Sequence, residues 1–195
     1  MLMAIFYKHR HPNVLAPLFY AGTTISPSSL AFQVQLGNLA DFRKLSNGMF
    51  PKPLAKSISR GITCGLSHMH DHHILHRDLK PLNVLMGAGD VGVLIPRIAD
   101  FGWARPIREA AGGASQPPSG HRGLTPGAVT PIWRPLELEL GLRYSFPADL
   151  WSFGLIVTEL LTGDDWLNGA RDVLQKGILK VITDLAGPVY STCWP

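Results

Sequence analysis

The chain has 195 residues, of which 46% are hydrophobic and 16% are charged, and its formal net charge is +4. This composition is typical of a globular protein with one core, and it excludes a disordered chain. The excess of positive charge is small, and the lysines and arginines form no continuous run, so nucleic acid is not expected as a partner.

The cysteine content and the length of the apolar stretches indicate in which cellular compartment the protein is expected. Cys64 and Cys193 are the only cysteines, which is too few for a disulfide framework. The most apolar stretch of the second half, residues 150 to 161, has 12 residues and contains Glu159, so it is too short to cross a bilayer. These features predict an intracellular protein, cytoplasmic or nuclear, with no membrane partner.

The first part of the chain predicts two helices with two strands between them. Residues 1 to 10 resemble the end of a helix, which Pro12 terminates because proline cannot continue it. Strands are predicted over residues 14 to 20 and 29 to 35. From residue 50 to about residue 70, apolar side chains recur every three or four positions, which predicts an amphipathic helix buried on one face. Its apolar positions are Leu54, Ile58, Ile62, Leu66 and Met69.

The second part predicts two short strands, a long loop and two helices. The strands lie around residues 83 to 86 and 93 to 98, with a Gly-Ala-Gly-Asp turn between them. Residues 106 to 128 are rich in Gly, Pro, Ser and Ala, and such a long irregular segment is typical of a functional loop. Residues 149 to 161 predict a central buried helix, and residues 165 to 186 carry a further helical pattern.

Two short motifs carry the chemistry of the chain. HRDLKPLN occupies residues 76 to 83, and DFG follows at residues 100 to 102. The carboxylate of Asp78 can accept the proton of an attacking hydroxyl, and Lys80 can neutralise charge on a transferring phosphoryl group. Asn83 and Asp100 offer an amide and a carboxylate oxygen, which are ligands that Mg²⁺ prefers. These residue types predict phosphoryl transfer from a magnesium-bound triphosphate.

In this order and spacing, the two motifs resemble the HRDxxxxN and DFG signatures of protein kinases. Four further segments resemble the same family, namely HPNVL at 11–15, LAFQVQ at 30–35, VTPIWRPLE at 129–137 and DLWSFG at 149–154. The third of them is similar to the VTxWYRAPE stretch of cyclin-dependent and mitogen-activated kinases. The resemblance implies an α+β, protein kinase-like fold, with a mainly α-helical large lobe and a remnant of the small-lobe β-sheet.

The resemblance also implies how the domain is divided and what it does. Residues 1–195 correspond to one incomplete protein kinase domain, with a small-lobe remnant and the start of the hinge at 1–35. Residues 36–195 correspond to a large lobe that is truncated at its C-terminus. We expect a serine/threonine protein kinase that transfers the γ-phosphoryl group of Mg-ATP to a Ser or Thr hydroxyl of a protein substrate.

Part of the family pattern has no counterpart in the chain. No GxGxxG loop and no VAIK-like strand occur, so the N-terminal part of the small lobe is lacking, and Leu2 stands where the family has a glutamate. Preorganised charge around the phosphates commonly contributes orders of magnitude to the rate, so we expect impaired activity. A catalytically inactive, kinase-like interaction module is the alternative.

Individual residues of the nucleotide site follow from the resemblance. Phe32 occupies the gatekeeper position, and the backbone of Gln33 and Gln35 would form hydrogen bonds with adenine. Leu85 would form the floor beneath the base.

The resemblance assigns further residues to the catalytic loop. Lys80, where tyrosine kinases typically have alanine, implies serine/threonine specificity. Thr130 should lie against Asp78 and Lys80 at the substrate hydroxyl. Asp149 would tie the backbone of the catalytic loop to the central helix.

A regulatory phosphorylation by an activating kinase is a further expectation. Thr125 lies where the cyclin-dependent family places its activating phosphothreonine, and Arg77 and Arg105 occupy two of the usual positions that pair with it. A phosphate there adds negative charge that can order a loop through arginines. Thr125 as an unmodified loop residue is the alternative, because Ser115 and Ser119 lie in the same segment.

A cluster of histidines allows an unrelated interpretation, a metal site. No cysteine or second cluster completes a tetrahedral ligand set. In kinases, moreover, the histidine of the first motif packs beneath the phenylalanine of DFG, here Phe101, while the others would cap a helix C-terminus. The histidines are His68, His70, His72, His73 and His76.

Overall fold

The computed structural model describes residues 2–22, 27–46, 48–89, 92–107 and 144–163, together with residues 133, 135 and 137. In chain order, its elements are α1 (Leu2–Lys8), β1 (Phe19–Gly22), β2 (Pro27–Ala31), β3 (Gly37–Asn38), α2 (Leu39–Leu45), α3 (Lys52–Asp71), β4 (Ile74–Leu75), the 3₁₀ helix η1 (Pro81–Asn83), β5 (Val84–Ala88), β6 (Leu94–Ile98), β7 (Arg105–Pro106) and α5 (Pro147–Thr162).

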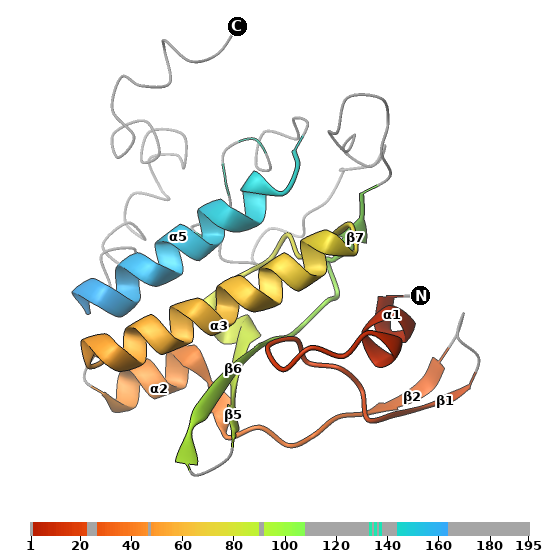
Figure 1. The fold of residues 1–195 in the computed structure, drawn as a ribbon, viewed down its shortest axis with the longest axis horizontal. Coiled ribbons are helices and arrows are strands. Elements are labelled where there is room, and N and C mark those ends of the chain that lie inside the picture. Colours follow the sequence, from red (N-terminus) through yellow and green to blue (C-terminus); the bar gives the residue numbers. More distant parts are fainter. Residues whose placement is uncertain are drawn as a thin grey trace, which may run out of the picture.

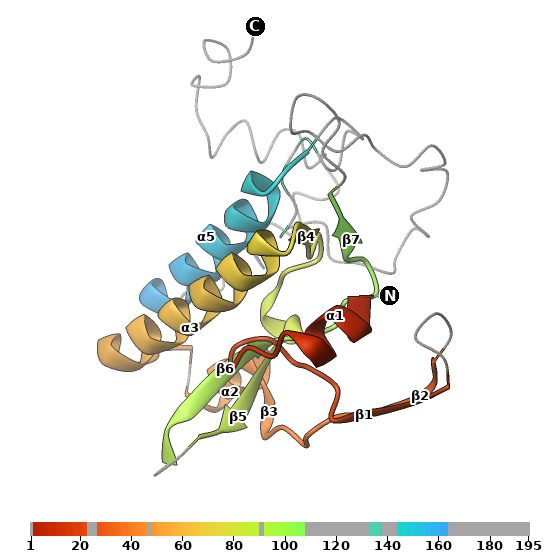
Figure 2. The same ribbon diagram turned by 45° about the vertical axis from the view of Figure 1, so that its right-hand side comes forward.

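The long helix α3 lies at the centre of this arrangement. Figures 1 and 2 show α5 along one side of α3 and the β5–β6 hairpin on the other side. Strand β5 is the middle strand of a sheet with the order β3–β5–β6, while β1 and β2 pair only with each other. Helix α1 lies between the central sheet and the end of α3 that leads into β4 (Figure 2). The predicted α+β fold is therefore confirmed.

Helix α3 buries one face, as its periodicity predicts. The buried face of the helix includes Ala55, Ile58, Ile62, Leu66 and Met69, all at most 2% exposed. The segment before β1 and strand β6 approach this face closely at Gly61 and Gly65. A Cβ atom on Gly65 would lie 2.6 Å from the backbone oxygen of Asn13 and 3.0 Å from Cδ1 of Ile98. The absence of a side chain thus sets the distance between α3 and the sheet.

The strand predicted over residues 14–20 is present only in its last part. Val14 forms an isolated parallel bridge with Ile98 of β6, and the amide of Leu15 donates to the carbonyl oxygen of Ile98 at 2.8 Å. Pro17 follows and has no N–H group for a ladder. Strand β1 therefore begins only at Phe19.

The strand predicted over residues 29–35 ends early, at Ala31. The chain then leaves the β1–β2 pair and crosses to the central sheet, where the amide of Leu36 donates to the carbonyl oxygen of Met86. Strand β3 and helix α2, which follow, are not predicted by the sequence analysis. A short signal for α2 exists, because Oδ1 of Asn38 accepts a hydrogen bond from the amide of Asp41 and so caps the helix.

Helix α5 confirms the helix predicted over residues 149–161, but it begins two residues earlier, at Pro147. Within the described part of the chain it is buried on one side only, since Leu150 and Leu161 are at least half exposed. The buried side carries an ion pair at 3.1 Å between Glu159 and Arg43 of α2. None of the described helices is long and apolar enough to cross a membrane.

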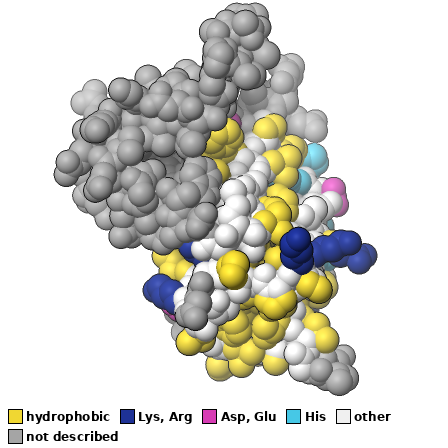
Figure 3. Space-filling model, turned by 90° about the vertical axis from the view of Figure 1, so that its left-hand side faces the viewer, with side chains coloured by type: hydrophobic (Ala, Val, Ile, Leu, Met, Phe, Trp, Pro, Cys, Tyr) yellow, Lys and Arg dark blue, Asp and Glu magenta, His cyan; other side chains and the backbone are white. Residues whose placement is uncertain are grey.

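One face of the molecule is shown in Figure 3. Hydrophobic side chains are spread over it between clusters of Lys and Arg, and Asp and Glu are few. This distribution agrees with the net charge of +4.

Two predicted segments fall mainly or wholly outside the described residues. Of the loop at 106–128, the structure describes the first two residues, and Pro106 belongs to β7. The helical pattern at 165–186 lies outside the described residues altogether.

The glycines of α3 and α5 lead to opposite predictions for the same substitution. Gly65→Ala should lower the free energy of unfolding by about 1–3 kcal/mol, because the new methyl group meets backbone atoms of Asn13. Gly154→Ala in α5 should raise it by about 0.4–1 kcal/mol, since no described atom lies within 4 Å of the new group. Urea denaturation measures both values, and a Gly65→Ala chain as stable as wild type would contradict the close packing.

Candidate active site

The loop between β4 and η1 is held by one carboxylate from α5. Oδ2 of Asp149 accepts a hydrogen bond from the amide of His76, and Oδ1 accepts one from the amide of Arg77, each at 2.9 Å. Oδ2 also lies 2.9 Å from Nε2 of His70. Asp149 is only 1% exposed, so these hydrogen bonds replace those that its oxygens would otherwise form with water. The predicted tie between the loop and the helix is confirmed.

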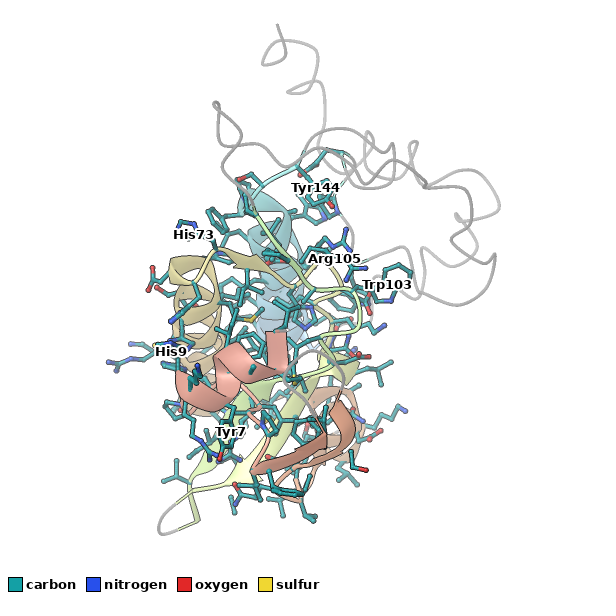
Figure 4. All side chains as sticks on the ribbon, turned by 90° about the vertical axis from the view of Figure 1, so that its right-hand side faces the viewer. Tyr7, His9, His73, Trp103, Arg105 and Tyr144 are labelled. Atoms are coloured by element: carbon teal, nitrogen blue, oxygen red, sulfur yellow. The ribbon has the colours of Figure 1, made fainter. Side chains whose placement is uncertain are left out.

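Arg77 has an uncommon backbone conformation that this tie supports. Its φ angle is +69°, in the left-handed region that costs energy for a residue other than glycine. Its side chain is fixed as well, because Nε donates to the carbonyl oxygen of Trp103 at 2.6 Å and Nη1 donates to the hydroxyl of Tyr144 at 2.7 Å. Trp103, Arg105 and Tyr144 lie on the same side of the molecule in Figure 4.

Three of the predicted catalytic and metal-binding residues are brought together in the next turn of the loop. Oδ2 of Asp78 accepts a hydrogen bond from Nζ of Lys80 at 2.8 Å and one from Nδ2 of Asn83 at 3.1 Å. Nδ2 of Asn83 also donates to the carbonyl oxygen of Asp78 at 2.7 Å. Leu79 is fully buried, so the extended backbone turns Asp78 and Lys80 to the opposite side.

The fourth residue, Asp100, follows β6 and joins this cluster through the backbone. The amide of Ala99 donates to the backbone oxygen of Asn83 at 2.8 Å. Asp100 itself is exposed, has a φ angle of +60°, and its Oδ1 accepts a hydrogen bond from the amide of Gly102 at 3.3 Å. Aspartate is one of the few residues that tolerate this conformation.

Phe101 connects the catalytic loop to α1. Its ring centroid lies 5.6 Å from that of His76 and 4.6 Å from that of Phe6. The expected packing of His76 against Phe101 is confirmed.

A cavity of about 810 Å³ opens beside this cluster. Five residues of its lining were assigned to a site by the sequence analysis, namely Phe32, Asn83, Leu85, Asp100 and Arg105. Its volume is within the range of small-molecule sites, and its lining is mainly apolar, as is usual for such sites. Leu2, which the sequence analysis places at the family's glutamate position, also lines the cavity, whereas the apolar wall residues Met3, Leu15, Leu30 and Leu82 were not predicted.

Leu30 is the wall residue that a sequence signal could have identified. It lies two positions before Phe32 in a segment predicted as a strand, and side chains two positions apart share a face. Leu15 carries no such signal, because its place depends on the bond between its amide and the backbone oxygen of Ile98.

Some predicted residues lie elsewhere or are not described. Gln33 and Gln35 do not line the cavity, and the carbonyl oxygen of Gln33 accepts a hydrogen bond from the side chain of Gln35. Arg105 is exposed, and its Nη1 donates to the carbonyl oxygen of Ala104. Thr125 and Thr130 lie outside the described residues.

The histidines proposed as an alternative metal site point to separate partners. His70 contacts Asp149, and Nε2 of His76 lies 2.9 Å from the carbonyl oxygen of Ala99. Within the described part of the chain, no group of three or more His, Cys, Asp or Glu side chains is placed to hold a metal ion. The structure therefore gives the metal interpretation no support.

Two of these histidines pack instead against the residues that follow α1. The ring of His68 stacks on His11 with the centroids 4.8 Å apart, and it lies 4.5 Å from the ring of His72. The ring of His72 in turn lies 4.8 Å from that of His9. Burial, followed by the charge of His68, lowers the pKa of His11. The contacts among these four histidine rings join the residues that follow α1 to the end of α3.

A loop of this geometry, beside a cavity in the size range of small-molecule sites, agrees with a protein kinase domain. Residues 3–190 match the family model described as Protein kinase domain, and the chain belongs to this family. The resemblance found in the sequence is thereby confirmed.

The similar proteins include several cyclin-dependent kinases. Probable cyclin-dependent kinase 9 of Caenorhabditis elegans is 34% identical over 95% of this chain and 39% of its own length. Cyclin-dependent kinase 2 of the same organism is 32% identical over 95% of this chain and 47% of its own length. Human cyclin-dependent kinase 20 is 34% identical over 85% of this chain and 44% of its own length. The chain thus resembles serine/threonine kinases of this group and spans less than half the length of each of the three.

The buried bonds of Asp149 predict a large loss of stability when the carboxylate is removed. Asp149→Ala should lower the free energy of unfolding by about 2–4 kcal/mol, because two peptide N–H groups lose their acceptors and unsatisfied buried groups cost about 1–3 kcal/mol each. Asp71→Ala is the matched control, since Asp71 is exposed, and it should stay within about 0.5 kcal/mol of wild type. Equal urea midpoints for the two variants would refute the role of Asp149.

Proposed function

We propose that this chain carries the catalytic loop of a serine/threonine protein kinase that transfers the γ-phosphoryl group of ATP to a protein hydroxyl. The observation that supports this most directly is the carboxylate of Asp78, bonded to Lys80 and Asn83 beside the cavity that Asn83 and Asp100 line. Since the chain spans less than half the length of its relatives, the activity, the substrate and the partners belong to the proposal.

The residues of the loop have separate roles in this reaction. The hydroxyl oxygen of the substrate forms a bond to the γ-phosphorus, the bond from that phosphorus to the bridging oxygen breaks, and ADP leaves. Asp78 orients the hydroxyl and accepts its proton, while Lys80 stabilises the charge on the phosphoryl oxygens. By resemblance, Thr130 contributes beside the acceptor hydroxyl.

The donor set of the cavity suits a magnesium ion. Asn83 and Asp100, which both line the cavity, offer one amide and one carboxylate oxygen, and Mg²⁺ prefers hard oxygen ligands. Nδ2 of Asn83 is directed at Asp78, which leaves the amide oxygen on the other side of the group. When bound, the ion would neutralise charge on the phosphates of the nucleotide.

The apolar part of the cavity suits the base of the nucleotide. We assign Leu85 to the floor and Phe32 to the gatekeeper position, and both line the cavity. The backbone of Gln33 and Gln35 would form hydrogen bonds with adenine, by resemblance to the family. Residues 1–35 then correspond to small-lobe elements and the start of the hinge, and the residues from 36 onward to the large lobe.

One observation favours the alternative, an interaction module without turnover. Leu2 stands where the resemblance implies a glutamate, and it lines the cavity together with Met3. The wall formed by α1 is therefore apolar and offers no carboxylate to pair with a phosphate-binding lysine.

Substitution of Asp78 and of Asp100 separates nucleotide binding from phosphotransfer. Asp100→Asn should weaken Mg-dependent ATP binding by at least about tenfold, because one of the two metal ligands loses its charge. Asp78→Asn should leave that binding nearly unchanged and lower phosphotransfer by about 10²- to 10⁴-fold, because the proton acceptor is lost. Binding is measured by calorimetry with and without Mg²⁺, and transfer with labelled ATP and a generic protein substrate.

Asp71→Asn is the control for these variants, because Asp71 is exposed on α3. A wild-type chain that binds Mg-ATP without transferring phosphate would support the interaction module. Activity that survives both substitutions unchanged would show that the assigned roles are wrong.

We also propose that phosphorylation of Thr125 by an activating kinase orders the segment around it. Arg105 is exposed and lies on the same side of the molecule as Tyr144, the partner of Arg77 (Figure 4). A phosphate paired with arginines can form about one to three charge-assisted hydrogen bonds.

Semisynthetic chains test this regulation. A chain with phosphothreonine at 125 should resist limited proteolysis better than the unmodified chain, and Arg105→Ala should remove much of the protection. A chain with phosphoserine at 119 is the control for charge alone. Equal protection by the two phosphates would contradict a specific role for Thr125.

A further inference from the structure

Two consecutive hydrogen bonds connect β6 to the segment expected to bind adenine. Nη1 of Arg97 donates to Oε1 of Gln35 at 2.7 Å. Nε2 of Gln35 then donates to the carbonyl oxygen of Gln33 at 2.8 Å. Arg97 can only donate, so it fixes which end of the Gln35 amide faces it and directs the NH₂ end at the backbone oxygen.

The sheet register explains how Arg97 reaches this place. Arg97 pairs with Leu85 across the β5–β6 ladder, and side chains of directly opposite residues lie on the same face of an antiparallel pair. Leu85 lines the cavity, so Arg97 extends from the same face of the sheet. On the other side of β5, the bond from the amide of Leu36 to Met86 places Gln35 beside the strand.

Gly87 allows the side chain of Arg97 to cross β5 and reach Gln35. It lies two residues after Leu85 in β5 and is buried. A Cβ atom on Gly87 would lie 2.6 Å from Oε1 of Gln35 and would overlap Nη1 of Arg97. The guanidinium therefore occupies the space that a side chain at position 87 would fill.

We propose that Arg97 and Gln35 form a cap on the carbonyl oxygen of Gln33, and that this cap determines base selectivity. The inference rests on the proposed function, in which the backbone of Gln33 binds adenine by resemblance to the family. The 6-amino group is the only N–H donor of adenine in a nucleotide, so it is the group whose hydrogen bond this carbonyl oxygen would accept. The guanidinium charge polarises the Gln35 amide and strengthens its bond to the oxygen. An oxygen that already accepts this bond gains less from a second donor, so the chain discriminates weakly between purines with and without the amino group.

The test compares the dissociation constants of two nucleotides that differ only in this group. The full chain is titrated with Mg-ATP and with the Mg complex of purine riboside triphosphate, which lacks the 6-amino group. For the wild type, the ratio of the two constants should be below about threefold. Gln35→Glu keeps an acceptor for Arg97 but has no donor for the oxygen of Gln33, so the ratio should rise to about tenfold, the value for one restored hydrogen bond.

Two further substitutions remove the hydrogen bond between Arg97 and Gln35. Arg97→Met removes the donor that orients the amide, and Gly87→Ala displaces the guanidinium while leaving both polar side chains present. Both should raise the ratio above the wild-type value. Arg60→Met is the control, because Arg60 is exposed on α3 and the substitution removes the same charge.

The ratio distinguishes a role in selectivity from a role in stability. A general structural effect changes the affinity for both nucleotides equally and leaves the ratio at its wild-type value. A wild-type ratio near ten that none of the substitutions changes would refute the cap while nucleotide binding stands. A wild-type chain that binds neither nucleotide would refute the proposed function and the cap with it.

Discussion

The buried carboxylate of Asp149 is the constraint on which the rest of this structure depends. Its two oxygens accept the amides of His76 and Arg77, and this holds Arg77 in a left-handed backbone conformation. A strained residue persists only where its surroundings over-determine it, and Arg77 has three such anchors, in Asp149, Trp103 and Tyr144. The loop can then project Asp78 and Lys80 to one side while Leu79 stays in the core.

Close packing around α3 transmits this constraint to the other half of the site. Gly65 lets the chain at Asn13 approach the helix, and the same segment bonds to Ile98 at the end of β6. Asp100 follows two residues later, so its place relative to Asn83 depends on how closely α3 packs against the sheet. The rings of Phe6, Phe101 and His76 extend the contact to α1.

The cavity has two chemically different sides. Asn83 and Asp100 supply polar oxygens from the loop and from the end of β6, whereas Leu2, Leu15 and Leu30 supply apolar walls from the first 35 residues. Hard oxygen ligands of this kind suit a divalent cation on the first side, and an apolar ring suits the second. This division agrees with membership of the protein kinase family, while the apolar wall at Leu2 explains why an interaction module remains the competing proposal.

Much of the fold and the polar part of the site could be predicted from the sequence. The spacing of Ile58, Ile62 and Leu66 predicted α3, and the order of Asp78, Lys80, Asn83 and Asp100 predicted that these residues belong to one site, because both predictions depend on local patterns. The place of Leu15 and the crossing of Arg97 over Gly87 were decided only by the tertiary structure. These contacts join residues far apart in the chain, and no local periodicity records which backbone groups meet when a helix, a sheet and a loop pack together.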